Sequence, residues 1–273
     1  MTADPIHDPT HYGTQWRRPP LIRAAHWRRL LYGGVALYLV LGIGALDIDW
    51  VRLSEGWTRG WRFLAGFAQP DFRSRWDAIA GGLLESLTMT LTATLVGILL
   101  AVPVGIGAAR NLVGLPLYLL CRAIIAVSRA LQEIIIAILF VAMVGFGPFA
   151  GFLTLSVATV GFLAKLLAAD IETVDPAPVE AVRAAGASPA QVLDYGIVPQ
   201  ILPALAGISL FRWDINIRES TVLGLVGAGG IGLALKTSVD TLAWPQVTLI
   251  FLLILATVLL SEWVSARVRR GLI

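Results

Sequence analysis

The amino-acid sequence predicts an all-α membrane protein with about six transmembrane helices. Hydrophobic residues fill 57% of the 273 positions and charged residues only 14%, whereas about a quarter of the residues in a soluble domain are charged. The mean hydropathy of the chain is +0.77, and several apolar runs are long enough to cross a hydrocarbon core of ~30 Å. The formal net charge of +3 is too small to indicate a protein that binds nucleic acid.

The first eighty residues are predicted as a tail, one transmembrane helix and a surface helix. Residues 1–29 contain five arginines and four prolines, so we expect an irregular cytoplasmic tail that is too long for the start of a cleaved signal peptide. Residues 30–80 follow as the next domain, and residues 30–46 are its transmembrane helix. Residues 47–78 place tryptophans and arginines on different sides of a helical turn, which is typical of a helix lying in the membrane interface.

Residues 81–264 are predicted to form a core of five further transmembrane helices. Their apolar runs cover residues 83–109, 131–147, 152–169, 200–226 and 246–264. Arginines gather again in a short C-terminal tail, residues 265–273. Because positive charge concentrates in cytoplasmic segments, and because six spans return the chain to its starting side, we expect both tails and the loop 170–199 in the cytoplasm.

The loop 170–199 has an internal order that an ordinary connection lacks. Residues 180–185 are rich in alanine, which favours a helix, and Gly186 follows at a position suited to a helix end. Ser188 and Pro189 then have the residue types of an N-cap and a first helical residue. We therefore predict a short helix–turn–helix that projects from the membrane surface.

A glycine-rich segment, residues 227–232, follows the predicted fifth span and formally matches the dinucleotide-binding pattern G-x-G-x-x-G. That pattern requires a strand before it and a soluble helix after it, whereas here both flanks are apolar runs. The overlapping stretch 230–237 lacks the glycine that a phosphate-binding loop needs before its lysine. We interpret the glycines instead as points of close backbone approach or as a bend. They are Gly227, Gly229, Gly230 and Gly232.

The predicted fifth span contains ionisable residues, which are costly inside a membrane and usually face a partner or an aqueous path. At about 100° per residue, Arg212, Asn216 and Glu219 share one stripe of the helix. Asp214 and Arg218 share the opposite stripe, in the acid-first i,i+4 order that favours pairing. Either both stripes are structural, or at least one arginine lines a route for an anion.

Of the two stripes, we expect the one with Arg212 to face the route, because Arg212 has no acidic neighbour one turn away. Asp214 and Arg218 can satisfy each other and therefore suit the packed side. Arg129 and Glu133 have the same i,i+4 spacing at the entry to the third span. We interpret them chiefly as a structural pair at the edge of the path.

From about residue 70 to its end, the chain resembles the permease subunit of phosphonate-type ABC importers. The residues that carry the resemblance are 129–133, 144–151, 180–199, Phe211-Arg-x-x-x-Asn-x-Arg218 and 226–232. The resemblance implies a type I ABC importer permease fold and makes the loop 170–199 the segment that couples to an ATPase. The coupling residues so implied are Glu180, Ala181, Gly186, Ala187 and Pro199. Phe211 and Glu219 depart from the family pattern, and Glu219 adds an acid that indicates a different substrate or an altered gate.

The same resemblance implies the partners and the cargo. It implies a homodimer in a bacterial inner membrane, with two cytoplasmic ATPase subunits that carry ATP and magnesium. An external binding protein would deliver a phosphonate, phosphite or phosphate, and guanidinium groups suit such oxyanions. The chain itself is expected to be no enzyme and to hold no cofactor or metal. Its one cysteine, Cys121, forms no metal-ligand set, and its three histidines all lie in the N-terminal tail.

Two alternatives remain at this point. One is an importer permease for another small solute, such as methionine or a polar amino acid, on the same fold, although the pair of arginines in the fifth span argues against it. The other is a stand-alone secondary transporter or a membrane-embedded enzyme. Secondary transporters commonly carry internal repeats, and no convincing repeat is present in the sequence.

Overall fold

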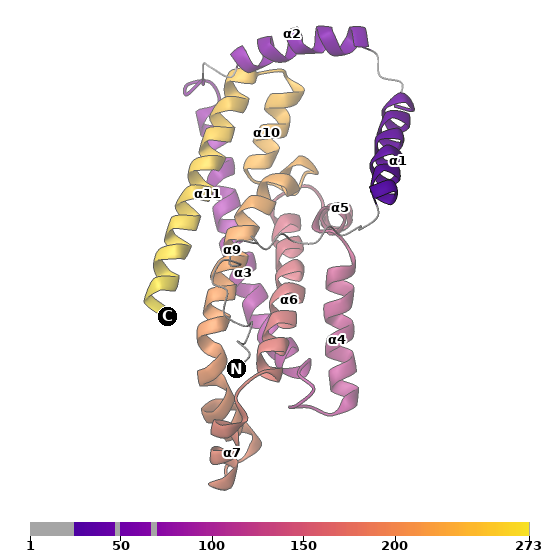
Figure 1. Ribbon diagram of the computed structural model, residues 1–273. Helices are drawn as coiled ribbons and strands as arrows, with labels where there is room; N and C mark the ends of the chain where they lie inside the picture. Colours follow the sequence, from indigo (N-terminus) through magenta and orange to yellow (C-terminus); the bar gives the residue numbers. More distant parts are fainter. Residues whose placement is uncertain (1–24, 47–49, 67–69, 273) are drawn as a thin grey trace, which may run out of the picture. The chain divides into compact units, whose positions relative to one another are not determined.

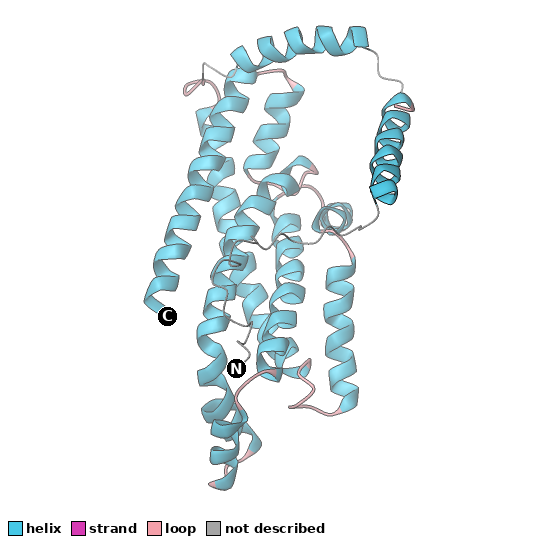
Figure 2. Cartoon of the chain, in the orientation of Figure 1, coloured by secondary structure: helices cyan, strands magenta, loops and turns pink. Residues whose placement is uncertain are grey.

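The structure, a computed structural model, describes residues 25–46, 50–66 and 70–272, and every regular element among them is a helix (Figure 2). The chain divides into two units, residues 1–62 and 63–273. Most of the predicted N-terminal tail lies outside the described residues. The predicted all-α class is confirmed for the part of the chain that the structure describes.

The first unit contains helix α1 (Ala25–Gly44) and most of helix α2 (Trp50–Gly66). Helix α2 confirms the amphipathic helix predicted within residues 47–78, and its Trp57 and Trp61 are exposed. Its place in the membrane interface stays a prediction. Helix α1 covers most of the first predicted span, but it begins with Arg28 and Arg29 in its first turns, which shortens its apolar part.

The second unit is a bundle of long helices with short helices at its ends and at one break. Its elements are α3 (Trp76–Gly107), α4 (Leu115–Ala130), α5 (Glu133–Val144), α6 (Pro148–Glu172), α7 (Pro176–Ala184), α8 (Pro189–Gln191), a π-helical turn (Val192–Ile197), α9 (Val198–Leu225), α10 (Ile231–Asp240) and α11 (Trp244–Leu272). In Figure 1, α7 lies at one end of this bundle and α10 at the other. The most extensive packing joins α3 and α6.

The number of spans differs from the sequence prediction. Among the described residues, four helical stretches are long and apolar enough to cross a membrane: Trp76–Gly107, Pro148–Glu172, Pro189–Leu225 and Trp244–Val268. Helices α4 and α5 count as a fifth only as a pair, because they are bent by 92° at Leu131 and Gln132. Helix α1 does not meet the same test, so the six predicted spans are four or five here.

Small residues allow the helices of the bundle to approach closely. A Cβ atom added to Gly105 of α3 would lie 2.8 Å from Leu167 Cδ2 of α6. Gly224 of α9 and Gly232 of α10 face each other across the bend that joins these helices, where an added Cβ on Gly232 would collide with the Thr221 carbonyl oxygen and would lie 2.8 Å from the Gly224 Cα. The predicted close backbone approach at the glycine-rich segment is therefore confirmed.

We predict that Gly232→Ala lowers the stability of the folded chain, because the backbone atoms that its methyl group meets cannot move aside. Overpacking of this kind typically costs about 1–3 kcal/mol. The matched control is Gly207→Ala in α9, where an added Cβ meets nothing within 4 Å. Thermal stability in detergent, read by size-exclusion chromatography of heated samples, should fall for the first variant and not for the second. Equal stability of the two variants would contradict the packing described here.

Candidate functional site

The centre of the bundle is held by a buried guanidinium group. Arg212 of α9 is 3% exposed, and its Nη2 donates to Glu133 Oε1 of α5 at 2.9 Å. Its Nε donates to the Thr159 hydroxyl of α6 at 3.3 Å, and the ring of Phe162 lies 5.3 Å from its Cζ. Arg212 has no acidic neighbour one turn away, and we expected it to face the route; in the chain it is instead buried against Glu133. Its partner comes from another helix, which spacing along α9 does not reveal.

A second polar side chain of the same stripe completes the network. Asn216 is fully buried, and its Nδ2 donates to Thr94 Oγ1 of α3 at 2.8 Å and to Thr159 Oγ1 at 3.0 Å. Because Thr159 also accepts from Arg212, one threonine joins the two polar residues of α9. The network therefore ties α3, α5, α6 and α9 together at one level of the bundle, although Glu133 Oε2 and Asn216 Oδ1 are buried without a hydrogen-bond partner among the described residues.

The opposite stripe of α9 carries the predicted ion pair. Arg218 Nη2 donates to Asp214 Oδ2 at 2.6 Å, and the second oxygen of Asp214 accepts from the Ser261 hydroxyl of α11, also at 2.6 Å. The Asp214 side chain is 9% exposed, whereas that of Arg218 is 46% exposed. The i,i+4 pairing is confirmed and Asp214 is packed against α11 as expected, but Arg218 rather than Arg212 reaches the surface of the chain.

The predicted pair of Arg129 and Glu133 does not form. Residues 131 and 132 have extended backbones, so α4 ends before α5 begins and the i,i+4 geometry of a single helix is lost. Arg129 is exposed, and its Cζ lies 5.7 Å from the ring of Phe162. Glu133 turns instead to Arg212. Glu219 is half-buried and lies within electrostatic reach of Glu133, Arg212 and Arg218.

The glycine-rich segment is a bend whose backbone is held by side chains of α3. Gly227, Gly229 and Gly230 have φ values of 90°, 80° and 74°, in the region that favours glycine. The Gly230 N–H donates to Glu85 Oε1 at 3.0 Å, and the Ile231 N–H donates to Ser86 Oγ at 2.9 Å. These two backbone donors at the start of α10 are thus occupied by protein groups and are not free to bind a phosphate.

The loop 170–199 forms the predicted helix–turn–helix. Helix α7 carries Glu180 and Ala181 on its exposed side, and Gly186 follows it with a φ of 81°. Ser188 then caps α8, with its hydroxyl accepting from the Gln191 N–H and the Gln191 side chain accepting from the Ser188 N–H. Ala187 is half-buried and Pro199 is exposed at the start of α9. The local signals in the sequence therefore described this segment correctly, except for the π-helical turn.

This loop is fastened to α9, and its buried residues Val179 and Val192 share a hydrophobic cluster with Leu167 and Ile171 of α6. Gln200 of α9 accepts from the Asp175 N–H at 2.9 Å, and its Nε2 donates to the Asp175 carbonyl at 3.3 Å and to the Gly196 carbonyl at 2.7 Å. Asp175 in turn caps α7 by accepting from the Ala177 N–H. A cavity of about 520 Å³ lies between the loop and the turn that follows α3, with Arg183 and Asn111 among its lining residues.

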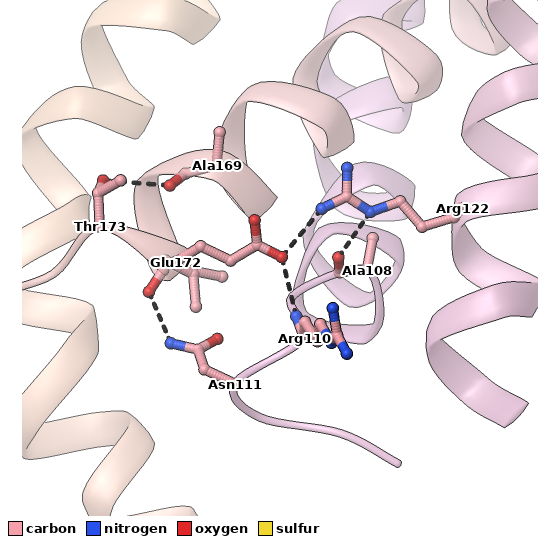
Figure 3. Close-up of polar contacts among 8 residues, drawn as sticks. Ala108, Arg110, Asn111, Arg122, Ala169, Glu172 and Thr173 are labelled. Atoms are coloured by element: carbon pink, nitrogen blue, oxygen red, sulfur yellow. Dashed lines mark hydrogen bonds and ion pairs between the residues drawn. The ribbon is translucent and has the colours of Figure 1, made fainter. Parts of the chain in front are cut away.

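Glu172, the last residue of α6, joins three helices beside this loop (Figure 3). Its Oε1 accepts from the Arg110 N–H and from Arg122 Nη2, both at 2.9 Å, and Arg122 Nε donates to the Ala108 carbonyl at 3.0 Å. Sequence reasoning did not pair these residues, because Arg122 and Glu172 lie 50 positions apart. The cluster connects the end of α3, the middle of α4 and the segment that leads into α7.

Comparison with known proteins identifies a family and relatives that match most of the chain. Residues 101–272 match the family described as binding-protein-dependent transport system inner membrane component. The phosphite transport system permease protein PtxC of Stutzerimonas stutzeri is 39% identical over 250 residues, which cover 89% of this chain and 90% of the relative. The phosphate-import permease protein PhnE of Mycolicibacterium smegmatis is 40% identical over 239 residues, 85% of this chain, but the match spans only 44% of that relative.

A solved structure establishes the fold. A chain of the MetNI methionine ABC transporter, in an inward-facing conformation, superposes on 74% of this chain and 99% of its own length, with a TM-score of 0.65 and 23% sequence identity. The fold is thus that of a type I ABC importer permease, as the sequence predicted. At this level of identity the likeness describes the architecture and not the cargo.

We predict that Arg212→Ala lowers the amount of folded protein, because it leaves the Glu133 carboxylate inside the bundle without its cation. Removing one partner of a buried ion pair costs about 3–5 kcal/mol. The control is Lys236→Ala in α10, which breaks the exposed i,i+4 pair with Asp240 and should change stability by less than about 1 kcal/mol. The measurement is the monodisperse fraction extracted in detergent at equal expression. Normal recovery of Arg212→Ala would show that the buried pair is not needed for folding.

Proposed function

The chain belongs to the family of binding-protein-dependent transport system inner membrane components, and we propose that it translocates a phosphorus oxyanion as the membrane subunit of an ATP-driven importer. The cargo class comprises phosphonate, phosphite and phosphate. The observation that carries this proposal is the similarity, over nearly the whole of both chains, to a relative named as a phosphite transport permease. An exposed guanidinium group on a spanning helix, Arg218, supports it because guanidinium donors match the oxygens of such anions.

The proposed assembly contains two copies of this chain in the inner membrane of a bacterium. Two cytoplasmic ATPase subunits would bind ATP and magnesium, and an external binding protein would deliver the cargo. On this proposal the C-terminal end of the chain and the loop 170–199 face the cytoplasm. The order of elements supports that orientation for the second unit, since α11 runs from the end where α10 lies towards the end where α7 lies (Figure 1).

We propose that α7, Gly186 and α8 form the surface that contacts the ATPase. The local geometry supports this role, because Gln200 and the capping interactions hold the loop as one body on the end of α9. A force applied to α7 would therefore reach α9 directly, and it would reach α4 through Glu172 and Arg122. Such a body transmits displacement better than a flexible connection would.

The cargo class is tested by uptake into membrane vesicles that contain the permease, its ATPase and its binding protein. We expect ATP-dependent uptake of at least one of phosphonate, phosphite and phosphate, and no uptake of methionine. Methionine is the informative competitor, because the solved MetNI chain has the same fold. Uptake of methionine without uptake of any of the three oxyanions would replace the proposed cargo with an amino acid.

We predict that Gly186→Leu leaves the permease in the membrane but abolishes uptake and cargo-stimulated ATP hydrolysis. An added side chain at Gly186 meets no atom within 4 Å, so the cost within the chain is only the strained backbone, about 1–2 kcal/mol. The bulk of leucine would instead obstruct a partner at the tip of the loop. The control is Gly186→Asn, because asparagine tolerates this backbone conformation, and it should retain more uptake. Full uptake by Gly186→Leu at normal expression would remove the loop from the coupling mechanism.

A further inference from the structure

One face of α9 remains uncovered by the rest of the second unit. At about 100° per residue, the side chains of this face lie within an arc of about 60° along the C-terminal half of the helix. They are Phe211, Arg218, Val222 and Leu225, and each is more than 40% exposed. The face is apolar except for Arg218, so a single guanidinium group interrupts an apolar stripe on a helix that is long enough to span the membrane.

The position of this guanidinium group is set from inside the bundle. Asp214 lies behind Arg218 and is itself held by the Ser261 hydroxyl of α11. Only Nη2 of Arg218 is engaged with Asp214, whereas its Nε and Nη1 make no hydrogen bond to any residue that the structure describes. Asp214 and Ser261 therefore act as positioning residues that present the remaining donors of Arg218 outward from the apolar stripe.

Lipid is an unfavourable neighbour for this face at the level of Arg218, which lies within a stretch long enough to span the membrane. Ionisable side chains inside transmembrane segments are costly and usually face a protein partner or a water-filled cavity. We therefore expect this face to meet protein or water. In a two-fold symmetric dimer the same patch of each copy meets itself, so a dimer that covers the stripe brings both Arg218 side chains to the axis between the copies.

We propose that Arg218 from two copies of this chain forms one oxyanion site on that axis, a site that neither copy completes alone. This inference rests on the proposed homodimeric importer and deepens it. Two guanidinium groups offer paired N–H donors to the several oxygens of a phosphonate, phosphite or phosphate. A zwitterionic amino acid carries one carboxylate, which a single guanidinium group can bind, so a second one adds no further pairing.

The carboxylate behind each guanidinium group suits a site in a transport path. Asp214 offsets the charge of Arg218 in its own copy, so two arginines can approach each other at the axis despite their like charge. The same offset weakens the hold on a bound anion, and a translocation site must release what it binds.

The test places a cysteine at the proposed axis. Arg218→Cys is combined with Cys121→Ala, which removes the one native cysteine, and with Asp214→Asn, which leaves no unpaired carboxylate while the amide still accepts from Ser261. In vesicles with ATPase and binding protein, a short bifunctional thiol reagent should join two copies through position 218. The control is Val127→Cys in the same background, because Val127 is 70% exposed on α4 and lies on another helix, and it should give much less joined dimer.

The same variant tests the chemistry of the site. Treatment with a thiol reagent that adds an ammonium group should raise phosphite uptake at least about tenfold over treatment with a matched reagent that adds a sulfonate, the scale of one charged contact. Arg218→Lys should likewise transport faster than Arg218→Gln when both are normalised to extracted permease. Failure to join the copies, or equal uptake after both reagents, would overturn the inference. If the unsubstituted chain takes up none of the three oxyanions, the proposed function fails instead.

Discussion

The contact between the Arg212 guanidinium and the Glu133 carboxylate is the interaction on which the arrangement of the bundle depends. Helix α5 has 12 residues and follows a bend of 92°. Because the helix is short and the chain turns sharply before it, the adjoining segments do not fix its position. Its first residue, Glu133, is bonded to α9 across the bundle. In a low-dielectric interior such a pair is costly to break from one side, and Thr159 and Asn216 extend it to α3 and α6.

This contact also determines how α9 is rotated about its own axis. With Arg212 and Asn216 turned into the bundle, Asp214 faces Ser261 of α11, and Arg218 is left on the uncovered side. The two arginines therefore have different roles. Arg212 is a structural residue of the bundle, whereas Arg218 is exposed and available to a partner outside the chain. An importer of phosphorus oxyanions needs an exposed guanidinium group to bind its cargo and a buried one to stabilise the bundle that carries it.

The sequence predicted local features well and long-range contacts poorly. Hydropathy located the long helices, and the order Gly186, Ser188, Pro189 described the turn between α7 and α8, because each signal acts within a few residues. The pair of Asp214 and Arg218 was likewise visible as an i,i+4 spacing. The break of the helix at Leu131 and Gln132 was not visible in the sequence, since neither residue is a glycine or proline. Because of this break, Glu133 pairs with Arg212 instead of with Arg129. Arg212 and Glu133 lie 79 positions apart, and the periodicity of a single helix does not reveal a contact between such distant residues.

The central claim is that Arg212 and Glu133 act as one buried structural unit, and a double-mutant cycle measures this most directly. Arg212→Met, Glu133→Leu and the double variant would be compared in detergent by their free energies of unfolding. The account predicts that the double variant is more stable than the sum of the two losses implies, with a coupling of about 1.5–3 kcal/mol, since residues in one ion pair are not independent. Losses that add to within about 0.5 kcal/mol would contradict it, because the two charges would then not depend on each other.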